Sequence, residues 1–409
     1  MVRSRAPVPE GIQRSIAHGR FAEAAAGLRV LAGREPSIPV LVALADMTFQ
    51  LGELQEAKET ALKAVEADPR EHPARVLLAR VRAALEETEE ALADFRAALE
   101  LARPRMAPPG NGPIAVPAHQ ALHNLEQLIY LEQVDRLPPG TLLPVPPGVR
   151  EVAQRKLGEM LTASTDEIPT IPMGGQYGRT VADPPLRLHD EPLPARCLNP
   201  RNDWNEVLAA FGGGGKGIIC VDDLLTPEAL AQLQRFCLRS TVWRRPYPPG
   251  YIGANPESGF FSPLLLRIAA ELRQAVPDLL GGHHLNYWWS FVCQHLKPGT
   301  DIHADQSDIS LNFWITPDSA NLDPAGGGLD VWDVAAPDDW TFDDYNSGGR
   351  DIRAFLEQRG AHQSSIAYGE NRALLFRGSI FHQTASVRFA SGFENRRRNV
   401  TMLFRRTNG

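Results

Sequence analysis

Residues 11–105 repeat with an offset of 34 positions, and this repeat limits the possible fold more than any other feature of the sequence. Small and apolar residues recur at that offset: Leu44-Ala45 with Leu78-Ala79, Ala57 with Ala91, Ala61 with Phe95, and Ala64 with Ala98. The Ala-, Leu- and Glu-rich composition predicts helices, and proline at position 69 would end the second helix of its pair. The segment is therefore expected to be a stack of helical pairs. A generic alanine-rich bundle is the alternative.

This period resembles that of tetratricopeptide repeats, which is about 34 residues. A shifted, partial copy precedes the two clear ones, because Gly19 stands five positions before Ala24 as Gly52 stands before Ala57. The resemblance implies a concave helical surface of the kind that often binds peptides. The repeats are thus expected to bind a protein partner or to form a homodimer.

From Gly217 onward the pattern changes from helical spacing to short runs of apolar and β-branched residues. Helices are expected at 225–239 and 263–276, the first capped near Thr226 and the second at Ser262. Short strands are expected at 217–221, 285–296, 310–316, 328–333, 363–368, 373–377, 384–389 and 397–405. Helices followed by strands with glycine turns favour an antiparallel sandwich or jelly roll over a parallel sheet. The predicted fold class is α+β.

Three regions are predicted: helical repeats at 1–105, a helix with proline-rich connections at 106–214, and a β-domain at 215–409. Within the middle region, helices are expected at 118–137 and 150–161. The proline-rich stretch 162–200 shows little periodicity and is expected to wrap the neighbouring domain in extended form. The glycines at 212–217 are interpreted as a hinge, since neither a preceding strand nor a following Ser or Thr makes them a phosphate-binding loop.

His303-Ala304-Asp305 and His382 are the candidate metal ligands. Residues two apart in a strand point to the same side, so His303 and Asp305 share one face. Two histidines and one carboxylate can occupy one face of an Fe(II) ion and leave the opposite positions open. His295 and His362 are weaker candidates for the same role.

The order of strand, His-x-Asp, strand, distal His382 and arginine-rich last strand resembles the Fe(II)/2-oxoglutarate-dependent oxygenases. The resemblance implies a double-stranded β-helix that binds Fe(II), 2-oxoglutarate and O2 and releases succinate and CO2. Asp305 fills a position that a halide would need, so hydroxylation rather than halogenation is implied. The substrate is expected to be a peptide or protein side chain, or a small metabolite.

The resemblance also implies an arginine on the last strand that holds the far carboxylate of 2-oxoglutarate as a bidentate pair. Alternation along that strand sends Arg397, Asn399 and Thr401 inward and makes Arg397 the first choice. Arg398 is the second choice, followed by Arg388 and Arg396. Gln294 is a further candidate contact to 2-oxoglutarate. The sequence departs from the simplest family pattern by a longer stretch, 388–395, before the last strand.

Two other classes of protein remain open: a repeat-based interaction protein with an inactive β-domain, and a cupin-like metal protein that uses no 2-oxoglutarate. A net charge of −7 disfavours a general nucleic-acid or membrane-surface protein. The chain has four cysteines without a CxxC pair and no apolar leader, so a cytoplasmic protein with reduced thiols is expected. Since all candidate ligands lie after residue 290, a chain beginning near residue 140 is expected to bind iron and 2-oxoglutarate alone.

Overall fold

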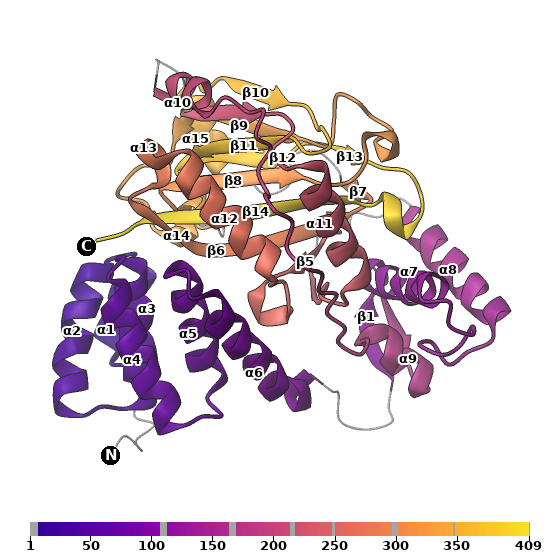
Figure 1. Ribbon diagram of the computed structural model, residues 1–409, viewed down its shortest axis with the longest axis horizontal. Helices are drawn as coiled ribbons and strands as arrows, with labels where there is room; N and C mark the ends of the chain where they lie inside the picture. Colours follow the sequence, from indigo (N-terminus) through magenta and orange to yellow (C-terminus); the bar gives the residue numbers. More distant parts are fainter. Residues whose placement is uncertain are drawn as a thin grey trace.

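The computed structural model describes residues 7–106, 113–162, 169–212, 217–247, 250–296, 302–346 and 348–408. Helical repeats come first, a small mixed region follows, and a β-rich domain with covering helices completes the chain (Figure 1). This is the predicted α+β order. No helix among the described residues is long and apolar enough to cross a membrane.

The repeats form three antiparallel helical pairs. Their helices are α1 (Glu10–Ala17), α2 (Phe21–Arg34), α3 (Ile38–Gln50), α4 (Leu54–Ala67), α5 (His72–Ala84) and α6 (Thr88–Met106). The alanines that recur in the sequence, Ala57 and Ala91 among them, are fully buried between helices. The helices can approach closely there because an alanine side chain fills little space. The predicted stack of pairs is confirmed, and the weak first copy is also a helical pair.

The middle region is richer in regular structure than the sequence predicts. It contains α7 (Ala118–Val134) and α8 (Pro147–Thr162), as expected, and also α9 (Gly175–Ala182) and a two-stranded sheet of β1 (Ile114–Pro117) and β2 (Thr170–Met173). The prediction of an extended stretch over 162–200 is therefore wrong for 170–182. Helix α9 is short and contains glycine, so its sequence carries little periodicity. Tertiary contacts hold it, because Asn124 of α7 donates to the Val181 carbonyl at 2.9 Å.

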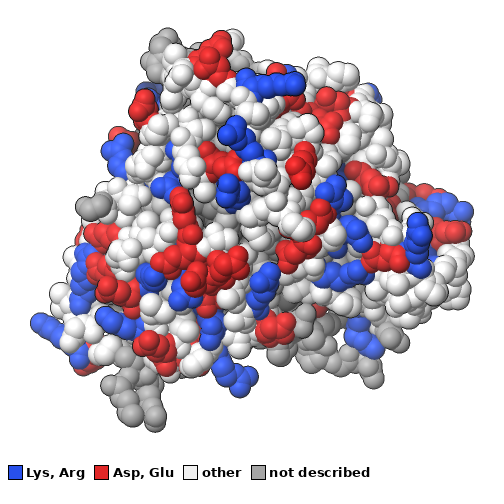
Figure 2. Space-filling view, in the orientation of Figure 1, with Lys and Arg blue, Asp and Glu red and all other residues white. Residues whose placement is uncertain are grey.

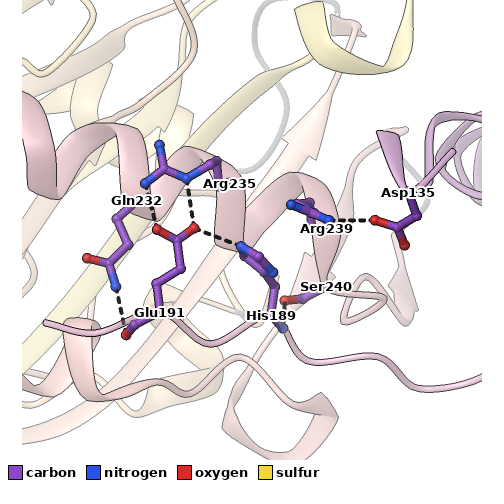
Figure 3. Close-up of polar contacts among 7 residues, drawn as sticks. All are labelled: Asp135, His189, Glu191, Gln232, Arg235, Arg239 and Ser240. Atoms are coloured by element: carbon purple, nitrogen blue, oxygen red, sulfur yellow. Dashed lines mark hydrogen bonds and ion pairs between the residues drawn. The ribbon is translucent and has the colours of Figure 1, made fainter. Parts of the chain in front are cut away.

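Residues 183–199 do wrap the neighbouring domain in extended form, as predicted. They lie along α11 (Pro227–Arg239), and Figure 3 shows the contacts that hold them. Both Arg235 Nε and a terminal nitrogen donate to Glu191 at 2.7 Å, and His189 Nε2 lies 2.7 Å from the same carboxylate. Arg239 pairs with Asp135, so α11 is also tied to the middle region. We call residues 183–199 the strap.

The C-terminal domain consists of two antiparallel sheets that face each other. The larger sheet has the order β3-β11-β8-β14-β6-β5-β4 and the smaller one β10-β9-β12, while β7 and β13 pair separately. The strands are β3 (Ile218–Val221), β4 (Arg245–Pro246), β5 (Ile252–Ala254), β6 (His283–Cys293), β7 (His295–Leu296), β8 (Ile309–Trp314), β9 (Leu329–Ala335), β10 (Gln363–Ile366), β11 (Ala373–Arg377), β12 (Ile380–Thr384), β13 (Val387–Arg388) and β14 (Arg397–Arg406). The remaining helices are α10 (Trp204–Gly212), α12 (Pro263–Ala275), α13 (Pro277–Leu280), α14 (Phe342–Tyr345) and α15 (Ile352–Gln358), with 3-10 turns at Pro256–Ser258, Asp318–Ala320 and Phe393–Asn395.

Two apolar clusters lie on opposite faces of the larger sheet. The outer cluster joins that sheet to α11, α12 and the repeat helices α5 and α6, through side chains such as Phe95, Phe261 and Trp288. The inner cluster lies between the two sheets and includes Trp314 and Phe376. Helices on one face and a second sheet on the other are the predicted jelly-roll arrangement. The helix caps at Thr226 and Ser262 are also confirmed, since each side chain accepts a backbone N–H three residues on.

The strand expected at 384–389 is wrong in its limits. Two shorter strands, β12 and β13, replace it, and His382 lies within β12 rather than before a strand. The glycine turn at 326–328 enters β9 as predicted. A Cβ at Gly328 would lie 1.8 Å from the Ile366 carbonyl oxygen, so only glycine allows β10 to pair there. The hinge glycines 213–216 and the turn at 297–299 lie outside the described residues.

Lys and Arg side chains are interspersed with Asp and Glu on the face of the molecule in Figure 2. Cations and anions alternate over the repeats as well as over the β-domain. Such a mixed surface creates no large field of one sign. This face therefore offers no extended basic area of the kind that nucleic acids require.

Candidate metal centre

The three candidate ligands lie together at one end of the space between the sheets. His303 and His382 form an isolated antiparallel bridge, with backbone N–O distances of 3.0 and 2.9 Å. Asp305 is fixed by its own backbone N–H, which donates to the Gly378 carbonyl at 2.8 Å. One possible ligand atom from each of the three side chains lies within 4.8 Å of the others, and no other such group occurs in the described part of the chain.

The surroundings of these side chains hold them in the state that a metal ligand needs. His382 Nδ1 lies 3.0 Å from the Ile380 carbonyl, to which it can only donate, so Nε2 keeps its lone pair. Burial lowers the pKa of His382 to about 4, and His303 nearby adds to the effect, so the ring is neutral at pH 7. The Ser310 hydroxyl donates to Asp305 Oδ2 at 2.6 Å and orients that carboxylate.

The donor set fits a first-row divalent metal such as Fe(II). His382 Nε2 lies 3.8 Å from Asp305 Oδ2, and His303 Nε2 lies 3.9 Å from Asp305 Oδ1. Two imidazoles and one carboxylate are the ligands of the 2-His-1-carboxylate facial triad, which leaves coordination positions open. Asp305 and His382 are buried while His303 is partly exposed, so the site is reached from the His303 side.

A row of buried polar side chains starts at Asp305 and follows the inner face of the larger sheet. Ser310 and Asn312 are two apart on β8, and Asn312 Nδ2 donates to Thr401 Oγ1 at 3.1 Å. Asn399 Nδ2 donates to the same hydroxyl at 3.2 Å, and a terminal nitrogen of Arg397 donates to Asn399 Oδ1 at 3.2 Å. We call this set the inner polar row; its members are Asp305, Ser310, Asn312, Thr401, Asn399 and Arg397.

Arg397 ends the inner polar row and is 2% exposed. Its Nε donates to the Gly327 carbonyl, and its guanidinium lies 5.9 Å from the centre of the Trp314 ring. Among the described residues no carboxylate forms an ion pair with it, and burial lowers its pKa. A buried cation without a counter-charge is costly, and a bound carboxylate would remove that cost.

The neighbouring arginines face the other side of the sheet. Arg398 donates to the carbonyls of Phe393, Glu394 and Arg396 and packs on the Phe393 ring at 5.0 Å. Burial lowers the pKa of Arg398 to about 10. Arg396 forms an ion pair with Glu126 of α7 at 2.6 Å. The predicted inward facing of Arg397, Asn399 and Thr401 therefore agrees with the strand's geometry.

The other candidates lie elsewhere. Gln294 follows β6, and its side chain donates to the Ala390 carbonyl at 3.5 Å rather than to the inner polar row. His295 is exposed on β7. His362 is an exposed residue whose backbone N–H donates to Asp333. Neither histidine belongs to the group of metal-ligand atoms.

A cavity of about 470 Å³ opens onto His303 and Asp305. Its lining includes Tyr287, Trp289 and Phe291 of β6, and also Gln50 and Arg80 from the repeats. Sequence reasoning assigned none of these five to a site. The Tyr-x-Trp-x-Phe alternation of β6 is a signal that could have located the first three, because side chains two apart share a face. No spacing in the sequence relates Gln50 or Arg80 to the metal ligands.

Comparison with known proteins identifies the repeats. Residues 38–71 and 72–104 match the tetratricopeptide repeat family model, which confirms the repeat prediction. These two units correspond to α3 with α4 and α5 with α6. No curated protein matches the chain in sequence.

Solved structures similar to about half of this chain include a prolyl-4-hydroxylase and enzymes described with α-ketoglutarate or 2-oxoglutarate. A Pseudomonas putida prolyl-4-hydroxylase is 13% identical and matches 51% of this chain and 100% of its own, with a TM-score of 0.33. The α-ketoglutarate-dependent epimerase SnoN is 10% identical over 50% of this chain and 87% of its own, with a TM-score of 0.35. HygX from Streptomyces hygroscopicus, with nickel and 2-oxoglutarate bound, is 12% identical over 48% and 86%, with a TM-score of 0.31. Sequence identities and TM-scores this low do not show a function for this chain.

Proposed function

We propose that this protein is an Fe(II)- and 2-oxoglutarate-dependent oxygenase that hydroxylates an unactivated C–H bond and releases succinate and CO2. One observation carries the proposal: the inner polar row connects a two-histidine, one-carboxylate cluster with a buried arginine that has no acidic partner among the described residues. Either half alone has an ordinary structural explanation. Together they supply a metal site and a carboxylate site joined by hydrogen-bonding groups.

In this proposal His303, Asp305 and His382 hold Fe(II), and Arg397 holds the far carboxylate of 2-oxoglutarate. Bound iron and 2-oxoglutarate would supply the oxidising chemistry when O2 enters. Asn399 and Thr401 lie between the two sites and offer polar atoms along the cosubstrate. Asn312 Oδ1 is buried and has no hydrogen-bond partner among the described residues, so it is a further acceptor in this space.

The chain's own residues then perform binding, orientation and exclusion of water. Ser310 keeps one Asp305 oxygen in place, and the Ile380 carbonyl keeps the Nδ1 proton on His382. Trp314 and Phe376 seal the inner space against solvent. Asp305 would supply a carboxylate ligand to bound iron where a halide would otherwise be needed, which favours hydroxylation over halogenation.

Metal binding and succinate release test this proposal on the full chain. We expect one Fe(II), or Mn(II) as a stand-in, per chain by equilibrium dialysis, together with metal-dependent formation of succinate from 2-oxoglutarate. His382→Ala and Asp305→Ala should abolish both. His295→Ala is the matched control, since His295 is exposed and lies outside the cluster.

Full metal occupancy in the Asp305→Ala, His382→Ala double variant would overturn the site. Stoichiometric metal binding without any 2-oxoglutarate turnover would instead favour a cupin-like metal domain. Absence of both activities in a folded chain would favour a repeat-based interaction protein with an inactive β-domain.

A further inference from the structure

The cavity above the metal cluster has the size of a small-molecule site. Its volume of about 470 Å³ lies in the usual range for ligands of drug or metabolite size. It reaches His303 and Asp305 at one end and the repeat helices α3 and α5 at another. If the proposed function holds, a substrate in this cavity lies next to the reacting centre.

One wall of the cavity is a continuous row of aromatic rings. Tyr247 and Tyr251 are stacked, with centroids 4.9 Å apart and an interplanar angle of 25°. Tyr251 is 4.6 Å from Phe291, and Trp289 lies 6.1 Å beyond Phe291 and 6.0 Å from Tyr287. Aromatic rings prefer to bury other flat rings in offset or edge-on contact. The row therefore favours a ligand with an aromatic or other flat unsaturated group.

Apart from Asp305 of the metal cluster, the Asp, Glu, Lys and Arg side chains that line the cavity are those of Arg245 and Arg80. Arg245 of β4 is exposed and forms no ion pair with a described residue. Arg80 of α5 lies over the Tyr287 ring at 5.0 Å and donates to the Asn286 carbonyl at 3.1 Å. Glu257, close to this wall, accepts a hydrogen bond from the Tyr287 hydroxyl at 2.8 Å. The two arginines favour an anionic group of the ligand near them over a cationic one, while Asp305 belongs to the metal cluster.

Three buried polar atoms of lining residues have no hydrogen-bond partner among the described residues. They are Arg80 Nε, Asn286 Oδ1 and Trp289 Nε1. Asn286 is itself only 5% exposed. A buried polar atom without a partner costs roughly 1–3 kcal/mol, so the residues of this wall carry polar groups that the described chain does not pair.

The repeats are fixed against this cavity by the chain's own packing. Phe95 of α6 stacks on Phe261 with centroids 4.9 Å apart and meets Trp288 of β6 edge-on at 5.7 Å. At Gly52, φ is +76° and a Cβ would lie 2.2 Å from the Arg406 carbonyl oxygen, so the C-terminal strand runs directly over the repeat turn. This shared core argues against the expectation that a chain beginning near residue 140 binds iron and 2-oxoglutarate without the repeats.

We propose that the substrate is a small anionic molecule with an aromatic or flat unsaturated group, and that the repeats form one wall of its binding site. Its ring lies against Trp289 and Phe291, and its carboxylate or phosphate lies at Arg245 and Arg80. The repeat surface on this side lines the substrate site of the chain itself and does not bind a separate peptide. This proposal rests on the proposed function only in calling the ligand a substrate; the binding site stands by itself.

Calorimetry on the full chain without metal tests the binding site apart from turnover. The probes are benzoate, phenylacetate, indole-3-acetate and phenyl phosphate, together with neutral amides or esters of the same rings. We expect at least one anion to bind 10-fold or more tightly than its neutral counterpart. Arg245→Gln and Arg80→Gln should each reduce that preference to within about 3-fold. Arg201→Gln, an exposed arginine outside the cavity, is the matched control.

Loss of folding in Arg80→Gln would be visible in thermal unfolding, and Arg245→Gln, at an exposed residue, then tests the contribution of positive charge by itself. Equal binding of anions and neutral counterparts by the wild-type chain would overturn the proposal. So would tight binding of an acidic peptide with no binding of the small anions. Anion-selective binding without iron-dependent succinate formation would refute the proposed function but support the binding site. Succinate formation without anion-selective binding would support the proposed function but refute the binding site.

Discussion

Arginine side chains are buried on both sides of the larger sheet at the start of β14, and their hydrogen-bond and ion-pair partners differ. On the outer side, Arg396 has the Glu126 carboxylate and Arg398 has three backbone carbonyls, although the Nε of each has no hydrogen-bond partner among the described residues. On the inner side, Arg397 has the Gly327 carbonyl and one Asn399 oxygen, with no acid among the described residues. All three side chains are almost fully buried.

Under the proposed function, this difference separates a structural charge from one that binds 2-oxoglutarate. Removing a cation from water costs several kcal/mol, which the protein must compensate by pairing or hydrogen bonds. The outer face supplies one carboxylate to Arg396 and three carbonyls to Arg398. Its next side chains, Val400 and Met402, belong to the apolar cluster shared with the helices. The inner face gives Arg397 two uncharged oxygen acceptors and no carboxylate among the described residues, and it continues as polar groups to the metal cluster. A site that binds an anion has this incomplete character.

The largest expected effect on the KM for 2-oxoglutarate comes from exchanging the guanidinium on each face. Arg397→Lys keeps the charge but loses the forked geometry for a carboxylate, so the KM for 2-oxoglutarate should rise about 10- to 100-fold, equivalent to roughly 1.5–3 kcal/mol. Fe(II) binding should be unchanged, because the metal ligands are untouched. Steady-state succinate formation over a range of 2-oxoglutarate concentrations measures the effect.

Arg398→Lys is the matched control for that exchange. It should lower stability, since three carbonyls lose their donors, but leave the KM for 2-oxoglutarate within about 2-fold of the wild type. If Arg398→Lys raises the KM and Arg397→Lys does not, the functional and structural faces have been assigned the wrong way round.

The second prediction tests whether the ion pair between Arg396 and Glu126 contributes to stability but not to 2-oxoglutarate binding. Glu126→Gln leaves Arg396 buried without its counter-charge, which should cost about 3 kcal/mol of the free energy of unfolding. Urea denaturation measures this loss, and the KM for 2-oxoglutarate of the folded variant should stay at the wild-type value. The double variant Glu126→Gln, Arg396→Met should recover part of the stability. A Glu126→Gln protein as stable as the wild type would show that this pair does not hold α7 to the β-domain.

Periodic patterns in the sequence were sufficient to predict the helical repeats and the side of the strand to which each inner side chain points. The repeat offset could be read from Ala57 and Ala91 because helix pairs place their small residues at fixed positions. Strand alternation was enough to send Arg397 inward, and the His-x-Asp spacing to put His303 and Asp305 on one face. These features depend on neighbours in the sequence or on strict periods, which a single sequence displays directly.

Contacts between distant segments could not be predicted in this way. Arg396 and Glu126 are 270 positions apart, and nothing in either neighbourhood marks the other. The same holds for Arg80, whose contact with Asn286 spans 206 positions and brings the repeats into the cavity wall. Short elements such as α9 were missed because tertiary packing, rather than intrinsic propensity, holds them in place.

A third, smaller effect concerns the carboxylate at the start of the inner polar row. Ser310→Ala removes the hydroxyl that donates to Asp305 at 2.6 Å, and loss of such an outer contact typically weakens metal binding about 10-fold. Competition with a chelating dye measures the Mn(II) affinity. Ser365→Ala is the matched control, since Ser365 donates to Asp330 at 2.6 Å on the smaller sheet, away from the metal ligands. Equal losses of Mn(II) affinity in the Ser310→Ala and Ser365→Ala variants would contradict a specific role for Ser310.

The smallest effect is expected for an ion pair on the outer surface, where the strap crosses α11 (Figure 3). The Arg235 guanidinium, helped by His189, lowers the pKa of Glu191 to about 2. A carboxylate with a lowered folded-state pKa stabilises the fold above its unfolded pKa of about 4.3 and loses that contribution as pH falls toward 2. Arg235 is largely exposed, so solvent screening limits the contribution to about 0.5–1 kcal/mol.

Glu191→Gln should therefore be less stable than the wild type by that amount at pH 7 and pH 5, and the gap should narrow at pH 3.5. Urea denaturation at the three pH values measures the gap, with Glu35→Gln, an exposed glutamate at the end of α2, as the control. Succinate formation at pH 7 should be unchanged, because the strap contributes no described residue to the metal cluster or to the cavity above it. A gap that widens on acidification, or a loss of turnover in Glu191→Gln, would show that this outer contact is more than a structural tie and that the division between the two faces is incomplete.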